Sequence, residues 1–142
     1  EMLGAWCGRF EDGLVGALLR RLAIESRDSG EDRKVAAALL KALQSREAMI
    51  DRIFFDWRGG RDPGAEAYPS EPFRELAVAL ESRGRAPGHA YWSDPEPCSM
   101  HIHEVEAIWS AIADDDDWLP FERKIEAIRR MGAAVASDAP AT

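Results

Sequence analysis

The sequence predicts an all-α fold of five to six helices, arranged as an irregular orthogonal bundle. Apolar residues recur at steps of three and four in several separate stretches, which is typical of helices with one buried face. No alternation of apolar and polar residues is long enough to indicate a strand. With 142 residues, 46% of them hydrophobic, the chain can build one sizeable core. We therefore expect a single helical domain over residues 1–132.

The first helix is predicted over residues 3–22, where apolar side chains share one helical face. Four glycines lie in this stretch, and each weakens a helix by roughly 1 kcal/mol relative to alanine. We therefore expect a break near Glu11-Asp12, with Asp12 capping a second segment. A polar loop over residues 25–32 follows, and a second helix is expected over 35–43.

Serine and glycine mark the ends of the next two helices. Ser45 is the predicted N-cap of a third helix, whose apolar face extends to Trp57. Gly59-Gly60 ends this helix, because glycine readily adopts the left-handed conformation found at helix ends. After a loop, Ser70 is the predicted N-cap of a short fourth helix.

A long Pro/Gly-rich crossing is predicted over residues 84–100. Prolines and glycines interrupt regular structure there, and we expect Tyr91 and Trp92 to pin the segment by packing. A fifth helix covers residues 105–112 and a sixth covers 121–131. Residues 133–142 are small and polar, so we expect a flexible tail.

The net charge of the chain indicates which classes of partner it is expected to bind. The chain holds 26 acidic and 18 basic residues, a net charge of −8. Nucleic acids and anionic membranes bind basic surfaces, so we expect neither as a partner. No apolar run approaches the roughly 20 residues that span a bilayer, and no secretory signal precedes the first helix. A cytoplasmic location and two reduced cysteines are the expectation.

The one cluster of metal-ligand types is Cys98, His101 and His103. Thiolate and imidazole are zinc ligands, but this spacing is half a motif, because a structural zinc site usually has a second ligand pair elsewhere in the chain. The alternative is that Cys98 packs as a small apolar group while the histidines lie at a helix N-terminus. We therefore predict no metal site, with these three residues as the candidates if one exists.

Catalytic and nucleotide-binding motifs are not found in the sequence. Gly59-Gly60 lacks the lysine and hydroxyl residue that follow a phosphate-binding loop. The acidic run 114–117 lacks the alternating ligands of a calcium loop, so it is predicted to be a solvated helix junction in which Asp116 or Asp117 caps the last helix. We assign no catalytic residue and no cofactor-binding residue to this chain.

Several stretches, in order along the chain, resemble the C-terminal helical region of a bacterial branch of the selenoprotein O-like family of protein adenylyltransferases. The stretch at residues 20–24, Arg-Arg-Leu-Ala-Ile, is similar to the basic-basic-Leu-Gly-Leu helix end of that family. The other stretches are Phe-Phe-Asp-Trp-Arg-Gly-Gly at 54–60, Pro-Cys-Ser-Met at 97–100, Glu-Val-Glu-Ala-Ile-Trp at 104–109, Asp-Asp-Trp at 116–118, Pro-Phe at 120–121 and Ile-Arg-Arg-Met-Gly at 128–132.

The resemblance implies membership of a family with a protein-kinase-like fold that transfers AMP from ATP to protein hydroxyl groups, with magnesium. The family's glycine-rich loop, phosphate-binding lysine and metal-binding Asp and Asn lie upstream of the matched region. Nothing in this chain corresponds to them, so ATP and magnesium are implied for the full-length family only. The resemblance thus implies a C-terminal fragment of a larger protein, a non-catalytic packing module for an N-terminal catalytic lobe.

Two other functions stay open. One is a self-contained helical interaction or regulatory module that pairs with a second copy of itself. The other is a small metal-binding protein that uses Cys98, His101 and His103. If the chain docks on a catalytic lobe, we expect leftover exposed apolar surface on helices with broad apolar faces, such as the helix at 50–57.

Overall fold

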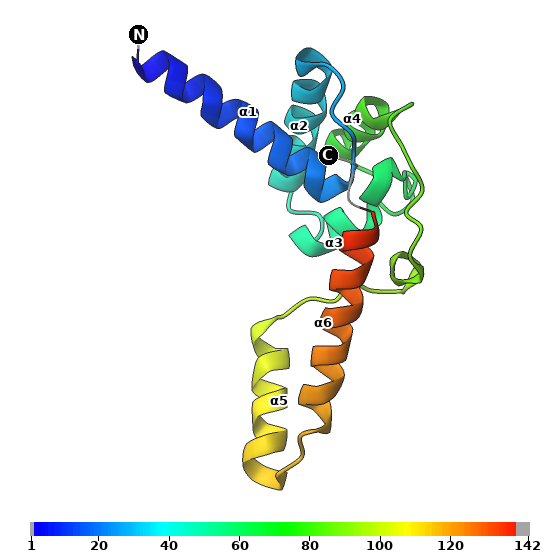
Figure 1. Ribbon diagram of the computed structural model, residues 1–142. Helices are drawn as coiled ribbons and strands as arrows, with labels where there is room; N and C mark the ends of the chain where they lie inside the picture. The colour runs from blue at the N-terminus through cyan, green and yellow to red at the C-terminus, as the bar shows by residue number, and fades with distance from the viewer. Residues whose placement is uncertain (1, 139–142) are drawn as a thin grey trace. The chain divides into compact units, whose positions relative to one another are not determined.

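The fold is all-α, as the sequence predicts. The computed structural model describes the backbone of residues 2–138 and the side chains of residues 7–138. Six α helices and two short 3-10 helices account for the regular structure of this range, and no strand occurs in it (Figure 1). The helices are α1 (Met2–Leu22), α2 (Ser29–Gln44), α3 (Ile50–Asp56), η1 (Arg58–Gly60), α4 (Glu71–Leu80), η2 (Ala90–Ser93), α5 (Ile102–Asp115) and α6 (Leu119–Ser137).

The chain divides into two compact units, whereas the sequence predicts one domain over residues 1–132. The N-terminal unit comprises Glu1–Pro87 together with Asp138–Thr142, and the hairpin unit comprises Gly88–Ser137. The predicted crossing over residues 84–100 is irregular apart from η2, and the boundary between the units falls within it.

The core of the N-terminal unit lies between α2 and α4, which pack side by side (Figure 1). The C-terminal half of α1 and the side chains of Ile53 and Phe54 on α3 complete it, and an aromatic cluster belongs to it. The rings of Trp57, Tyr68 and Phe73 lie 4.4–5.8 Å apart between centroids. The fully buried apolar side chains are Leu22, Leu39, Ala42, Ile53 and Leu76.

Helix α1 is continuous, so the predicted break near Glu11-Asp12 is wrong. Gly8 and Gly13 face open space, since a Cβ at either position would meet no atom within 4 Å. Nucleating a helix is the costly step, whereas each added residue gains a hydrogen bond. The packed C-terminal half therefore supports propagation of the helix through the glycines.

Helix α1 ends in a Schellman motif. Ala23 adopts the left-handed conformation at φ 57°, its N–H donates to Arg20 O at 3.0 Å, and Ile24 N–H donates to Leu19 O at 2.9 Å. These two bonds satisfy carbonyls that a helix end would otherwise leave unpaired, and the buried Leu19 and Ile24 supply the apolar contact that accompanies the motif.

Two predicted helix starts need correction or refinement. Ser45 is the C-cap of α2, where its Oγ donates to Ala42 O at 2.7 Å, and α3 begins instead after Met49. Ser70 does stand at the N-cap of α4, but its hydroxyl makes no capping hydrogen bond. Sequence cannot separate these roles, because serine hydroxyls bond to backbone groups at either end of a helix.

Gly59 and Gly60 lie in η1 and join two backbone segments, whereas α3 already ends at Asp56, before the predicted stop. Both have positive φ, at 67° and 71°. A Cβ at Gly59 would lie 2.1 Å from Arg85 O, and a Cβ at Gly60 would lie 2.7 Å from Gly84 Cα. Arg85 N–H donates to Gly59 O at 2.7 Å across this contact. Only glycine permits so close an approach of two backbones in this conformation.

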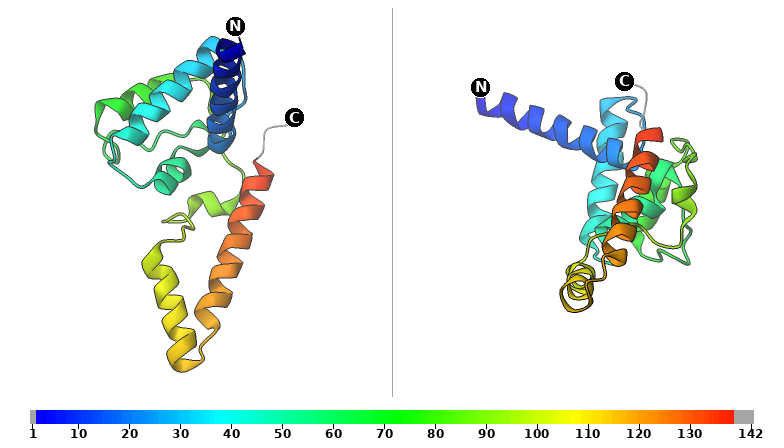
Figure 2. Two further views of the ribbon diagram at one scale, coloured as in Figure 1. Left: turned by 90° about the vertical axis from the view of Figure 1, so that its left-hand side faces the viewer. Right: turned by 60° about the horizontal axis from the view of Figure 1, so that its bottom comes forward.

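The hairpin unit consists of η2 and the antiparallel helices α5 and α6 (Figures 1 and 2). Between the helices, Asp117 Oδ1 accepts from Leu119 N–H at 3.0 Å. Trp118 Nε1–H donates to Asp116 Oδ1 at 3.0 Å, and Asp116 adopts a left-handed φ of 52°. The acidic run is thus an exposed helix junction, as predicted. Trp118 stands at the N-cap position of α6, and Asp117 accepts from the first N–H of the helix from one residue further out.

Helix α6 continues through 133–137, where the sequence predicts a flexible tail. Alanine has the highest helix propensity, and this segment is Ala-Ala-Val-Ala-Ser. Ala134 is fully buried, so packing adds to propensity. The tail prediction for 139–142 lies outside the described residues. None of the described helices is long and apolar enough to cross a membrane.

Candidate functional site

The predicted metal-ligand candidates do not assemble a site. The rings of His101 and His103 lie 6.0 Å apart between centroids. Cys98 is a half-buried free thiol whose backbone N–H donates to Tyr91 Oη at 2.8 Å. Within the described part of the chain, no group of three or more His, Cys, Asp or Glu residues could hold a metal ion. The structure therefore brings two imidazoles near one another without a third ligand.

The most buried ion pair among the described residues joins Asp32 and Arg83. Arg83 Nη2 donates to Asp32 Oδ1 at 2.5 Å, and the two side chains are only 5% and 3% exposed. Ser26 Oγ donates to Asp32 Oδ2 at 2.6 Å, and Arg27 N–H donates to the same carboxylate. The pair joins the α1–α2 loop and the start of α2 to the segment that follows α4.

The protonation state of Asp32 follows from these contacts. Burial raises the pKa of Asp32, but hydrogen bonds from Ser26 and Arg83 outweigh burial, so the pKa lies below its ordinary value. Asp32 is therefore held as a carboxylate paired with a guanidinium. An ionised carboxyl group cannot donate a proton at neutral pH. The role of the pair is therefore structural, since it joins segments that are distant in the sequence.

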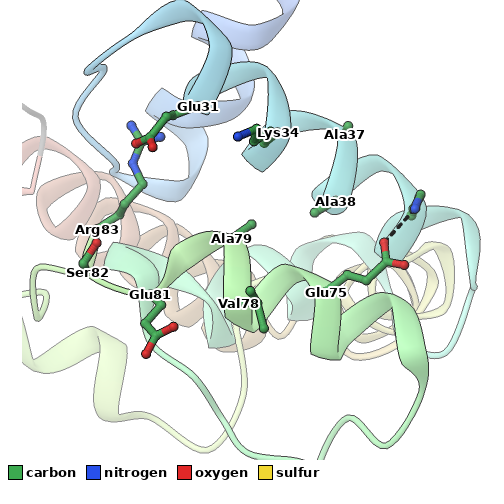
Figure 3. Close-up of a pocket in the computed structure, with 11 residues that line it drawn as sticks. Glu31, Lys34, Ala37, Ala38, Glu75, Val78, Ala79, Glu81, Ser82 and Arg83 are labelled. Carbon is green, nitrogen blue, oxygen red and sulfur yellow. Dashed lines mark hydrogen bonds and ion pairs between the residues drawn. The ribbon is translucent and has the colours of Figure 1, made fainter.

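A groove runs between α2 and α4 in the N-terminal unit (Figure 3). Its lining mixes basic and acidic side chains with three alanines and Val78, and the ion pair of Lys41 with Glu75, at 2.7 Å, joins α2 to α4 across it. Ser82 is the one hydroxyl residue in the lining, which holds no His or Cys. The groove thus offers no nucleophile with a neighbouring base. The charged lining residues are Glu31, Lys34, Lys41, Glu75, Glu81 and Arg83.

Helices α5 and α6 and the turn between them expose large apolar side chains. Trp109 is 69% exposed, Ile102 is 68% exposed and Trp118 is 51% exposed. No residue of α5 is buried, and Ala134 is the only buried residue of α6. We call the following set the hairpin apolar surface: Ile102, Val105, Trp109, Trp118, Leu119 and Phe121.

The spacing of these residues shows that α5 is apolar on two sides. Ile102, Val105 and Trp109 follow i, i+3 and i+7, so they share one helical face. Ile108 and Ile112 lie on a neighbouring face and are half-buried. The face of α5 that holds Ile108 and Ile112 is thus partly buried, while the face that holds Ile102, Val105 and Trp109 is exposed to solvent. Single exposed apolar residues are ordinary, but an ordered stripe of this kind marks an interaction surface.

The leftover apolar surface is not on the helix where the sequence predicts it. On the helix expected at 50–57, Ile53, Phe54, Phe55 and Trp57 are buried in the N-terminal unit, and Ile50 is exposed. The signal for the hairpin was present in the sequence, because the apolar residues of α5 cover too wide an arc for one packing face. Other exposed large apolar side chains of the N-terminal unit are Phe10, Leu14, Met49 and Val78.

The stretch at 54–60 that carries part of the family resemblance has a structural role here. Arg58 is buried, and its Nη1 donates to Arg21 O at 2.8 Å, close to the end of α1. Burial lowers the pKa of Arg58. Together with the contact of Gly59 and Gly60 with residues 84–85, this arrangement ties the stretch to two other segments. The stretch holds the N-terminal unit together and does not contribute to the hairpin apolar surface.

Comparison of the chain with protein-family models, with curated proteins and with solved structures found no match. The resemblance to the selenoprotein O-like family is therefore carried by the motifs in the sequence alone. Within the described part of the chain, the hairpin apolar surface is the candidate site of interaction that we consider further.

Proposed function

We propose that this chain is a non-catalytic helical packing module that docks on another protein through the hairpin apolar surface. The exposed stripe of Ile102, Val105 and Trp109 on α5 is the observation that carries the proposal. Fully burying such a side chain contributes roughly 1.5–3 kcal/mol. Several together can offset the cost of association, which is about 4–15 kcal/mol.

The motifs of the sequence suggest where such a module belongs. We propose that it is the C-terminal helical part of a selenoprotein O-like pseudokinase, in which an N-terminal catalytic lobe holds ATP and magnesium and transfers AMP to protein hydroxyls. Support comes from the order of the motifs and from Ala23, whose left-handed conformation stands where the family has glycine. This chain would then supply packing and no catalytic group.

Calorimetric titration tests the non-catalytic part of the proposal. The purified chain should show no heat of binding with ATP and magnesium, whereas a longer natural form that includes a catalytic lobe should bind. Binding of ATP by this chain alone would overturn the proposal. Size-exclusion chromatography with light scattering on the same sample measures whether a second copy occupies the docking surface.

Tryptophan quenching tests the docking surface directly. Acrylamide should quench a solvent-exposed component of the emission that is reduced in Trp109→Phe, with Trp118, which is also exposed, supplying the remainder. The matched control is Trp57→Phe, since Trp57 is buried and its loss should remove an unquenched component. If a monomeric chain shields Trp109 from acrylamide, the stripe is covered within the chain and the packing proposal fails.

A further inference from the structure

The hairpin unit is much more acidic than the N-terminal part of the chain. Residues 88–137 contain ten Asp and Glu against four Lys and Arg, a net charge of −6 with histidine neutral. Residues 1–87 contain fifteen acidic and fourteen basic residues, a net charge of −1. The exposed apolar stripe therefore lies on the more strongly charged of the two units. This negative charge favours a positively charged partner.

Half of the basic residues of the hairpin unit are engaged within it. Lys124 is nearly buried, donates to Ser99 O and pairs with Glu104 at 2.7 Å. Arg130 contacts both carboxylate oxygens of Asp94, and its guanidinium lies 5.6 Å from the Tyr91 ring centroid. These contacts hold α6 against α5 and η2. Outside these two pairs, the hairpin unit has eight acidic residues and two basic ones, Arg123 and Arg129.

Acidic side chains border the apolar stripe. Glu106 follows Ile102 by four residues and precedes Trp109 by three, so it lies on the same side of α5. Glu122 lies in the first turn of α6, next to the exposed Phe121 in sequence, and is likewise exposed. The exposed surface thus combines aromatic and aliphatic groups with flanking carboxylates.

We propose that the occupant of the hairpin apolar surface is a basic amphipathic helix of another protein. This inference rests on the proposed function and names the chemistry of its partner. Apolar anchors at i, i+3 and i+7 suit the apolar face of a helix, and lysine or arginine on its flanks would meet Glu106 and Glu122. Arginine can also stack on an exposed tryptophan such as Trp109. A second copy of this chain would instead bring a hairpin unit of the same −6 charge, which like-charge repulsion disfavours.

The test uses two synthetic peptides of roughly 18 residues, long enough to form a helix. One carries leucine on one face and lysine on the other, and its twin carries glutamate in place of lysine. Fluorescence anisotropy of the labelled peptides should show binding of the lysine peptide only, weakening as salt is added. Equal binding of both peptides would overturn the inference, because charge would then play no part.

Variants localise the binding. Trp109→Ser should weaken it by more than about tenfold, as the loss of a central aromatic anchor does. The double variant Glu106→Gln and Glu122→Gln should weaken it about threefold at low salt and flatten the salt dependence. The matched controls are Val78→Ser and Glu81→Gln, exposed positions of the N-terminal unit, and they should leave binding unchanged. Weakening by the controls equal to that by the hairpin variants would overturn the assignment.

The outcomes separate the two proposals. If acrylamide reaches Trp109 in the monomer but the lysine peptide does not bind, the basic-helix inference fails while the docking surface stands. If Trp109 is shielded in the monomer, the proposed function fails first. If light scattering shows a dimer that Trp109→Ser dissociates, the occupant is a second copy and the inference is overturned.

Discussion

Arg83 and Asp32, 51 residues apart in the sequence, form an ion pair at 2.5 Å that is almost closed to solvent. The pair is completed by Ser26 Oγ and Arg27 N–H on Asp32, and by Glu25 O, which accepts from Arg83 Nη2 at 2.8 Å. Because the desolvation cost of each charge is offset mainly by the other, removing one partner is far more damaging here than in an exposed ion pair.

Asp32→Ala should reduce the free energy of unfolding by about 3–5 kcal/mol, since Arg83 would be left buried without its counterion. Urea denaturation monitored by circular dichroism measures the loss. The control is Glu75→Ala, which removes an exposed partner of Lys41 and should cost less than about 1 kcal/mol. Similar losses in the two variants would contradict a buried, coupled pair.

The Asp32 carboxyl should also make stability depend on pH. Its pKa is lowered in the folded state, so its contribution is present above the unfolded pKa of about 3.9 and is lost as pH falls through the folded pKa. Stability measured from pH 7 to pH 2 should therefore fall less steeply below about pH 4 in Asp32→Asn than in the unaltered chain. Curves of equal slope would show that the folded pKa is not lowered.

Ala23→Gly should stabilise the chain by about 1 kcal/mol, because a residue with a Cβ pays roughly 1–2 kcal/mol to adopt the left-handed conformation that Ala23 has. Thermal unfolding measures the gain. Ala37→Gly is the matched control, since Ala37 is an exposed residue within α2, and it should destabilise by about 1 kcal/mol. A loss of stability in Ala23→Gly would argue against the Schellman motif at the end of α1.

Gly59→Ala should destabilise the N-terminal unit by more than about 2 kcal/mol. The left-handed conformation alone costs roughly 1–2 kcal/mol, and the added Cβ would also lie 2.1 Å from Arg85 O and displace the backbone bond there. Gly64→Ala isolates the first effect, because Gly64 has φ 91° and a Cβ added there would meet no atom within 4 Å. Denaturation should give a much lower free energy of unfolding for Gly59→Ala than for Gly64→Ala. An equal loss of stability in the two variants would rule out the close approach of residue 59 to Arg85 O.

Local patterns were sufficient for most of the helices. The periodic apolar faces predict all six, and the 114–117 junction lies where the sequence predicts it, whereas α3 ends at Asp56, before the predicted stop at Gly59-Gly60. Ser45 was misassigned because a hydroxyl can satisfy backbone groups at either helix end. The break in α1 was wrong because local propensities do not include the support that the packed half of a helix gives to its extension.

By itself the sequence determined the all-α class, the helical periods and the absence of a recognisable catalytic motif, since these depend on residue type and spacing along the chain. Only the tertiary structure decided that Asp32 meets Arg83, that Gly59 meets Arg85, and that the apolar stripe of α5 stays open while that of α3 is buried. An apolar face in the sequence indicates only that a helix can pack against another element. Whether that face is buried depends on which elements the fold places next to it.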